Sequence, residues 1–313
     1  MRIFRHYNRL PAEARGAVIA VGNFDGVHRG HQAVIGEAGR IAHTAGRPWA
    51  VMTFEPHPRN VFKPDTAPFR LTPLRVKARE IAALGVDHLV VLRFNRAFSQ
   101  MPAEAFVQDV IVKGLGAHHV VCGYDFAFGH GRTGTPEFLL HMGKSEGFGF
   151  TCVPQLKDGE GEGFSSTRAR ACLVNGDPSG ATHVLGRSFE IEGRVVVGDR
   201  RGRTIGYPTV NVRLGEFLRP ATGVYATRIG IEDKGKTVWY DGVANLGYRP
   251  TFAGADIGLE AHIFDFDGDL YGLRVRVALV DHLRPEQKFD GLEQLKKQIA
   301  EDSERARRIL ARP

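Results

Sequence analysis

The chain has 313 residues, of which 42% are hydrophobic and 25% are charged, and its net charge is +7. At about 150 residues per domain this length predicts two domains, each able to bury its own core, and the composition excludes disordered and collagen-like chains. No stretch approaches the ~18 uninterrupted apolar residues that a membrane-spanning helix needs, and the N-terminal segment MRIFRHYNRL lacks the apolar centre of a signal peptide. We therefore expect a cytoplasmic protein without a membrane partner.

The positive charge favours a polyanionic ligand, either a nucleotide or a nucleic acid. The 38 glycines gather in stretches that also carry cations, a pattern typical of backbone that approaches phosphate groups closely. These stretches are GNFDGVHRGH, GYDFAFGHGRTG and GDRRGRTIG. The cysteines Cys122, Cys152 and Cys172 have no C-x-x-C spacing, so they favour neither a disulfide framework nor a zinc site, and we expect reduced, buried thiols.

The first half of the chain alternates between strand and helix patterns. Short apolar runs rich in β-branched residues recur about every thirty residues, which is the length of one βαβ unit. These runs cover residues 17–21, 49–54, 88–92, 118–122 and 150–154. Apolar residues at helical spacing between the runs, as at Val34, Ile35 and Ala38, predict the intervening helices. Nearly continuous apolar strands are typical of a parallel sheet covered on both faces, so we predict an α/β, Rossmann-like domain whose ligands bind beyond the carboxyl ends of the strands.

The pattern changes at about residue 185. Apolar residues then alternate with period two over 189–197, 224–228 and 273–279, with turn signals between these runs, which predicts an antiparallel β domain, either a sandwich or a barrel. A helix from about Pro285 closes the chain, and we interpret its basic end, RARRIL, as a charged face and not as a nucleic-acid patch. The segment VNGDPSGATHVLGR is predicted to link the two halves.

The stretch from Gly22 to His31, GNFDGVHRGH, follows a predicted strand and leads into a predicted helix. The start of that helix offers unpaired N–H groups and a partial positive charge, which suit an anion, and Gly30 allows a phosphate to approach the backbone. His28 and His31 share one face of the helix start, where each imidazole can donate to phosphate oxygens. A metal site is the alternative, but it lacks a third ligand and the H-E-x-x-H pattern. We predict phosphate chemistry, with the loop residues Gly22, Asn23, Phe24 and Asp25 included in the site.

This motif resembles the adenylyltransferase signature of the bacterial bifunctional riboflavin kinase/FMN adenylyltransferase (FAD synthetase) family. Further blocks similar to the family occur in order along nearly the whole chain. They are TFEPHP (53–58), RLT (70–72), GYDF with FG (123–129), SSTR (165–168), GR (202–203), GYPTVN (206–211), GVYA (223–226), NLG with PTF (245–252) and DLYG (269–272). Ala127 and Phe164 depart from the residues common in the family. The resemblance implies a nucleotidyltransferase domain at 1–183 and a β-barrel kinase domain at 184–313.

For the first domain the resemblance implies that the phosphate of FMN attacks the α-phosphorus of ATP and that pyrophosphate leaves. Since the attacking phosphate is already ionised, positioning and charge stabilisation suffice. His28 and His31 are the implied charge-stabilising residues. The implied second phosphate clamp is Ser165, Ser166, Thr167 and Arg168, and the implied flavin-binding residues are His57, Phe62, Asp125 and Phe128. Without the resemblance, the serines read as a helix cap and the phenylalanines as packing.

For the second domain the resemblance implies phosphorylation of riboflavin, whose hydroxyl group needs a base. Glu260 matches the position of the family's base, and Thr209 and Asn211 match its ligands for ATP phosphates and Mg²⁺. The other implied residues are Tyr207 at the flavin, and Gly202 and Arg203 in a phosphate lid. Period two places Glu260 opposite Leu259, Ala261 and Ile263, and it leaves open which of the two faces is the core.

Two alternatives remain at this stage. One is a single-activity FMN adenylyltransferase with a non-catalytic β module, which the intact Thr209, Asn211 and Glu260 disfavour. The other is a nucleic-acid-binding protein, which the spread of positive charge over both halves disfavours. We expect riboflavin to become FMN at the second domain and FMN to become FAD at the first, with ATP as co-substrate and Mg²⁺ in both. We expect a monomer or weak homo-oligomer with no nucleic-acid partner.

Overall fold

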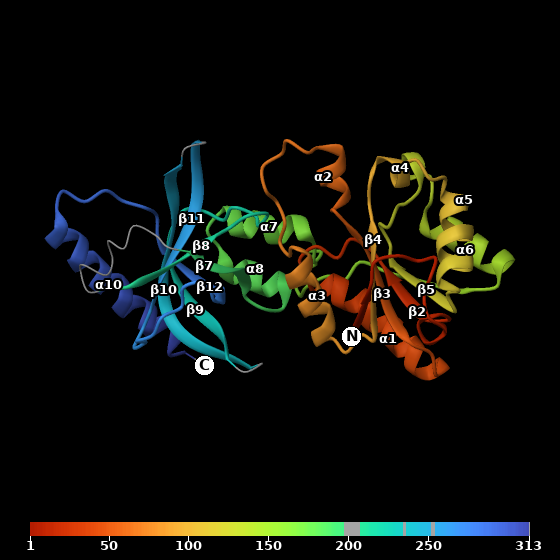
Figure 1. The fold of residues 1–313 in the computed structure, drawn as a ribbon, viewed down its shortest axis with the longest axis horizontal. Helices are drawn as coiled ribbons and strands as arrows, with labels where there is room; N and C mark the ends of the chain where they lie inside the picture. Colours follow the sequence, from red (N-terminus) through yellow and green to blue (C-terminus); the bar gives the residue numbers. More distant parts are fainter. Residues whose placement is uncertain (197–206, 234–235, 252–253, 313) are drawn as a thin grey trace. The chain divides into compact units, whose positions relative to one another are not determined.

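The structure is a computed structural model that describes residues 1–196, 207–233, 236–251 and 254–312. The chain divides into two compact units (Figure 1). The first comprises Met1–Ala67 and Thr72–Ser165, and the second comprises Pro68–Leu71 and Ser166–Pro313. Because this division follows packing, the functional boundary between residues 183 and 184 stays a prediction. The lid residues Gly202 and Arg203 lie outside the described part of the chain.

The first unit contains a six-stranded parallel sheet in the order β1-β4-β3-β2-β5-β6. Its strands are β1 (Arg2–Phe4), β2 (Val18–Val21), β3 (Trp49–Glu55), β4 (His88–Arg93), β5 (His119–Gly123) and β6 (Gly149–Val153). The predicted Rossmann-like sheet is confirmed. The sequence pattern missed only the edge strand β1, because its three residues are exposed or half-buried and form no apolar run.

Helices cover both faces of this sheet, as the continuous apolar strands predicted. Val18 and Ala20 of β2 pack with Ile35 of α1 on one face, whereas Ile19 of β2 packs with Val110 on the other. The helices are α1 (Arg29–Ala45), α2 (Pro58–Phe62), α3 (Leu74–Ala83), α4 (Arg96–Ser99), α5 (Ala103–Ala105), η2, a π-helix (Phe106–Leu115), and α6 (Pro136–Glu146), with 3₁₀ turns η1 (Ala12–Ala14) and η3 (His130–Arg132).

The second unit contains a closed antiparallel barrel in the order β10-β11-β8-β7-β12-β9, so the barrel and not the sandwich is confirmed. Its strands are β7 (Phe189–Val196), β8 (Thr209–Arg213), β9 (Gly223–Asp233), β10 (Lys236–Thr251), β11 (Gly254–Ile263) and β12 (Arg274–Arg284). The segment Pro68–Leu71 joins this unit through a parallel bridge between Arg70 and Phe217. Within that segment Phe69 is 5% exposed and Leu71 is 1% exposed, so four residues from the first half of the chain are built into the second unit.

The segment predicted to be a linker is instead helical. Following α7 (Ser166–Val174), the helix α8 (Pro178–Leu185) packs against β7 and β12 and buries Ala181 and Val184 completely. Asp177 caps it by accepting from the Gly180 N–H (2.7 Å), and Gly186 ends it with a φ of +76°. The linker prediction was wrong because these Asp, Pro and Gly residues mark the two ends of a helix.

The C-terminal helix α10 runs from Leu292 to Leu310 and therefore begins later than predicted. The residues before it, PEQKFDG, contain no apolar stripe that a helix could bury. Ala306 and Leu310 pack on Val224 and Ala226 of the barrel. In the basic end of the helix, Arg307 forms two hydrogen bonds to Asp265 (2.7 and 2.9 Å), so that cation holds the helix to the barrel. Among the described residues no helix is long and apolar enough to cross a membrane.

Candidate active sites

The first candidate site lies at the carboxyl ends of β2 and β5. These strands are neighbours although β3 and β4 come between them in the chain. The sheet therefore grows in opposite directions from this pair, and such a switch point leaves a crevice for a ligand. The loop that starts at Gly22 follows β2, and the turn that holds Asp125 follows β5. The topology thus brings two of the predicted motifs to one edge of the sheet.

The loop after β2 has a fixed and unusual shape. Phe24, Gly26 and Val27 all have a positive φ (49°, 89° and 44°). Asp25 is 2% exposed, and its carboxylate accepts from the Thr72 N–H (3.0 Å), while the Gly26 N–H donates to the Thr72 hydroxyl (2.8 Å). Such a strained turn persists only where its surroundings hold it, so the buried Asp25 carboxylate shapes the loop. A direct contact between Asp25 and phosphate stays a prediction.

The two histidines meet at the start of α1, as predicted. His28 is the N-cap residue, and its Nδ1 accepts from the His31 N–H (3.3 Å). The two rings are stacked with their centroids 3.5 Å apart, and Phe24 contacts the His31 ring edge-on at 5.2 Å. Because Nδ1 of His28 is the acceptor, the ring proton of the neutral form is on Nε2. His28 can therefore cap the helix and donate to an anion at the same time.

Gly30 stands where a side chain would be crowded. A Cβ at this position would lie 3.1 Å from the His28 ring and 3.2 Å from the Phe164 carbonyl oxygen. The Arg29 guanidinium lies 6.0 Å from the centroid of the Phe164 ring. The chain that leads to Ser165 therefore runs along the start of α1 within the first unit. The other clamp residues, Ser166, Thr167 and Arg168, open α7 in the second unit, and their contact with ATP stays a prediction.

Two of the predicted flavin-binding residues follow β3. His57 is the N-cap residue of α2, and its Nδ1 accepts from the Arg59 N–H (3.2 Å). Phe62, at the end of the same helix, is 61% exposed and contacts the Phe94 ring edge-on at 5.8 Å. An exposed aromatic ring such as that of Phe62 suits stacking on a planar ligand.

The other two predicted flavin-binding residues, Asp125 and Phe128, follow β5, and they differ in exposure. Asp125 is exposed in the turn after the strand. Phe128 is only 7% exposed and packs in the core against Phe106 (5.1 Å) and Phe126 (5.5 Å). Phe128 is a core residue in this structure, so a flavin contact would require that packing to open. The alternative that a loop phenylalanine serves packing fits Phe128 better than it fits Phe62.

The second candidate site lies on the outer wall of the barrel. Leu259, Ala261 and Ile263 are at most 5% exposed and point into the barrel, which settles the face that periodicity left open. Glu260 is therefore on the outer face. Its register partners are Asn211 on β8 and Asn245 on β10, so the structure places the predicted base and a predicted phosphate ligand side by side.

Glu260, Asn211 and Asn245 form a row of polar side chains on the outer face, and His262, the next outward position on β11, continues it. His262 is the register partner of Thr209, and its Nδ1 lies 2.9 Å from the Pro208 carbonyl oxygen, to which it donates. Tyr207 contacts the His262 ring edge-on at 5.3 Å. At the other side of the row, the Asn245 amide donates to the Glu286 carboxylate (3.2 Å). Thr209, Asn211 and Glu260 thus lie on one face, and Tyr207 reaches that face through His262.

The donor atoms of this row fit a hard cation. Thr209 offers a hydroxyl oxygen and Asn211 an amide oxygen, and such oxygens suit Mg²⁺, which binds largely through phosphates and water. No group of three His, Cys, Asp or Glu side chains suited to a metal ion exists among the described residues.

Sequence reasoning missed Lys77, Thr72 and Asn245. Lys77 is buried although charged, and it lies four residues before Ile81 on the buried face of α3. A lysine at an apolar position of a helix is the signal that could have revealed it. Thr72 and Asn245 stand within the motifs RLT and NLG. Their hydrogen bonds, from Thr72 to the loop of Asp25 and from Asn245 to Glu286, join residues that are distant in sequence.

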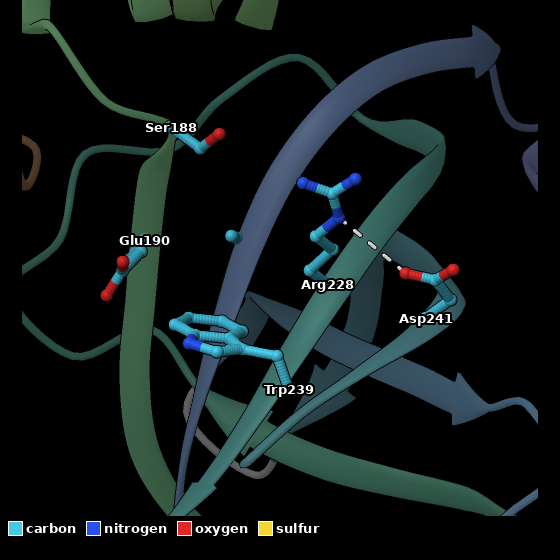
Figure 2. Close-up of a pocket in the computed structure, with 6 residues that line it drawn as sticks. Ser188, Glu190, Arg228, Trp239 and Asp241 are labelled. Carbon is cyan, nitrogen blue, oxygen red and sulfur yellow. Dashed lines mark ion pairs between the residues drawn. The ribbon is translucent and has the colours of Figure 1, made fainter. Parts of the chain in front are cut away.

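A groove of about 440 Å³ on another part of the barrel wall contains none of the predicted site residues. It is lined by Ser188, Glu190, Arg228, Trp239, Asp241 and Ala278 (Figure 2). Arg228 pairs with Asp241 at 3.6 Å (Figure 2), and Glu190 pairs with Arg276 at 2.8 Å. The charged groups of the groove therefore already neutralise one another.

Two family models match the chain in order, FAD synthetase at residues 10–168 and riboflavin kinase at residues 185–310. The bifunctional riboflavin kinase/FMN adenylyltransferase of Escherichia coli (strain K12) is 42% identical over 309 residues, which are 98% of this chain and 97% of that protein. The chain belongs to this family. A second bifunctional riboflavin kinase/FMN adenylyltransferase, from Bacillus subtilis (strain 168), is 39% identical over 318 residues, 99% of this chain and 98% of that protein.

A solved structure shares the fold over the same length. The crystal structure of a protein from Streptococcus pneumoniae, which carries the name macrolide-efflux protein, matches with a TM-score of 0.85 and 32% identity. The match covers 98% of this chain and 99% of that one. Assignment to the bifunctional riboflavin kinase/FMN adenylyltransferase family rests on the two family models and the curated relatives.

Proposed function

We propose that this chain makes FAD from riboflavin in two steps that each consume ATP. The second unit phosphorylates riboflavin to FMN, and the first unit transfers the adenylyl group of ATP to FMN and releases pyrophosphate. The observation that carries the proposal is that each unit brings together polar side chains that one of these reactions would use. The first has a pair of imidazoles at a helix start, and the second has a carboxylate in a row of oxygen ligands.

In adenylyl transfer, a phosphate oxygen of FMN attacks the α-phosphorus of ATP, and the bond from that phosphorus to the pyrophosphate oxygen breaks. No protein nucleophile is needed. The Nε2–H of His28, the His31 ring and the N-terminus of α1 stabilise the charge that develops on the phosphate oxygens. We assign Ser165, Ser166, Thr167 and Arg168 to the nucleotide phosphates, and His57, Phe62 and Asp125 to the flavin side. The positions of the last three at the carboxyl ends of β3 and β5 support this assignment.

In riboflavin phosphorylation, the Glu260 carboxylate takes the proton of the flavin's terminal hydroxyl group, whose oxygen attacks the γ-phosphorus of ATP. ADP leaves as the bond to the bridging oxygen breaks. Thr209 and Asn211 would hold Mg²⁺, which would neutralise charge on the ATP phosphates when bound. Tyr207, next to His262, borders the flavin. We further propose that the enzyme works in the cytoplasm on these small molecules, as a monomer or weak homo-oligomer without a nucleic-acid partner.

Chromatography of flavins tests this proposal. Purified protein is incubated with riboflavin, ATP and Mg²⁺, and FMN should appear first and FAD second. If riboflavin is unchanged but supplied FMN becomes FAD, the single-activity alternative is correct. If neither flavin reacts, the proposed function is wrong.

A further inference from the structure

A lysine is buried beneath the loop that leads to the paired histidines. Lys77 lies in α3, which packs on the same face of the sheet as α1, and its side chain is completely inaccessible to solvent (0%). Burial of an ammonium group is costly unless its charge and its hydrogen bonds are compensated. The contacts of Lys77 therefore show which groups compensate its buried charge.

The ammonium group donates two hydrogen bonds to protein oxygens and forms an ion pair with a carboxylate. Its Nζ lies 2.7 Å from the Asn23 carbonyl oxygen, 3.3 Å from the Thr53 hydroxyl and 3.8 Å from the Glu55 carboxylate. The Thr53 hydroxyl also donates to the Asn23 carbonyl (3.1 Å). The Asn23 carbonyl of the β2–α1 loop thus accepts two hydrogen bonds. One donor is the Thr53 hydroxyl in β3, and the other is the Lys77 ammonium group in α3.

This arrangement fixes the direction of the next N–H group. In a trans peptide the C=O and N–H bonds point in opposite directions. Because the Asn23 carbonyl points to Lys77, the Phe24 N–H points away from α3. Phe24 itself contacts His31, and the loop ends at His28. The lysine accordingly sets the orientation of a backbone donor in the loop assigned to phosphate.

We propose that Lys77 is a positioning residue for adenylyl transfer. It holds the Asn23 carbonyl so that the Phe24 N–H is directed to the nucleotide phosphates, and it keeps the loop in register with the flavin side through Thr53 and Glu55. Lys77 does not touch substrate, because its side chain is sealed from solvent and its donors are engaged by protein oxygens. This inference rests on the proposed adenylyl transfer in the first unit.

Kinetics of FMN conversion test the catalytic part. Lys77→Met keeps an unbranched chain in the pocket and removes the donors, and it should lower kcat about 100-fold because the loop donor is displaced, with KM for FMN and ATP changed much less. Thr53→Val should lower kcat about fivefold, which is the value of one hydrogen bond. The double variant should be no worse than Lys77→Met, since both changes act on the same carbonyl. Riboflavin phosphorylation should be unchanged throughout.

Amide hydrogen exchange tests the positioning part without relying on activity. Exchange over residues 22–26 should be faster in Lys77→Met than in the unchanged protein. The matched control is Thr151→Val, which removes the contact between Thr151 and His119 (2.8 Å) in the same unit. That control should alter neither kcat nor exchange in the loop.

Three results would overturn the inference: an unchanged kcat in folded Lys77→Met, an equal loss of kcat in Thr151→Val, or unchanged exchange in the loop. If Lys77→Met does not fold, Thr53→Val decides, and an unchanged kcat there overturns the inference. If the unchanged protein does not convert FMN, the proposed function has failed. The exchange measurement then still decides whether Lys77 fixes the loop.

Discussion

Glu260 of β11 lies directly opposite Asn211 of β8 on the outer wall of the barrel. Side chains of register partners leave a sheet on the same side, so the carboxylate and the amide are neighbours although a long stretch of chain separates them. Asn211 is 6% exposed, so its side chain is largely buried in the row of polar side chains that includes Glu260. This pairing would set the proposed proton acceptor, Glu260, next to Asn211, the proposed ligand for phosphate or metal.

Glu260→Gln should abolish this proton acceptor without changing the shape of the side chain. We expect riboflavin phosphorylation to fall by about 10²- to 10⁴-fold, which is the usual contribution of a general base. Conversion of supplied FMN to FAD should be unchanged. Initial rates with each flavin supplied separately measure both effects, and Glu232→Gln on β9 is an exposed control. Loss of both activities in a folded Glu260→Gln protein would contradict the assignment of one reaction to each unit.

His28 has two roles that a pair of substitutions can separate. His28→Asn retains an acceptor for the His31 N–H but removes the Nε2–H donor, whereas His28→Ala removes both. Both variants should lower FMN conversion about 100-fold, the usual effect of losing one donor to a developing anion. Only His28→Ala should also lose about 1 kcal/mol of stability, because Asn is a good N-cap residue. Thermal unfolding and FMN turnover measure the two effects, and an equal stability in both variants would argue against the cap.

The ion pair between Arg284 and Asp302 should anchor α10. Asp302 is 5% exposed, and its carboxylate accepts from Arg284 Nη2 (2.8 Å) and Nε (3.1 Å). Asp302→Asn leaves a largely buried cation without its counter-charge, which typically costs about 3 kcal/mol. The exposed pair between Arg307 and Asp265 is the matched control, and Asp265→Asn should cost less than about 1 kcal/mol. Urea unfolding compares the two variants, and equal losses would show that burial does not set the difference.

The cysteines should differ in reactivity and in their effect on alkaline stability. Burial raises the pKa of Cys122 from 9.0 to about 12, whereas Cys152 is exposed and Cys172 half-buried; the expectation of buried thiols therefore holds only for Cys122. Iodoacetamide at neutral pH should label Cys152 first and Cys122 only after unfolding.

The sign of the pH effect follows from the raised pKa of Cys122. The folded state favours the protonated thiol, so this contribution to stability is complete below pH 9.0 and is lost as the pH rises towards about 12. Cys122→Ala should reduce the loss of stability across this range. Unfolding measured between pH 8 and pH 12 tests this, and an unchanged slope would contradict it.

The features that depend on residues close together in the sequence could be predicted from the sequence alone. The parallel strands are continuous apolar runs, and His28 and His31 meet because a helix start brings residues three apart together. The face of Glu260 was undetermined because period two does not distinguish the inside of a barrel from its outside. Its pairing with Asn211 depends on the register of β8 and β11, which no local signal specifies.

The errors have similarly local causes. Asp177, Pro178 and Gly186 are turn-forming residues, but here they begin and end α8. Lys77 was missed because a lysine in a helix usually faces solvent, and the oxygens around its ammonium group come from two other segments of the chain. The flavin contact of Phe128 stays a prediction, and its motif gave no sign that its ring packs among other phenylalanines.

The segment Pro68–Leu71 limits how the protein can be divided. Arg70 bridges Phe217, and the Leu218 N–H donates to the Arg70 carbonyl (2.8 Å), while Phe69 accepts from Arg170 (2.9 Å). A fragment that begins at residue 184 spans the riboflavin kinase match but lacks these four residues, all of α7 and most of α8. Such a fragment would expose the backbone around Phe217 and the apolar surfaces that the missing segments cover in the whole chain. The two activities are therefore encoded in order along the gene, but the two folded bodies cannot be separated by a single cut.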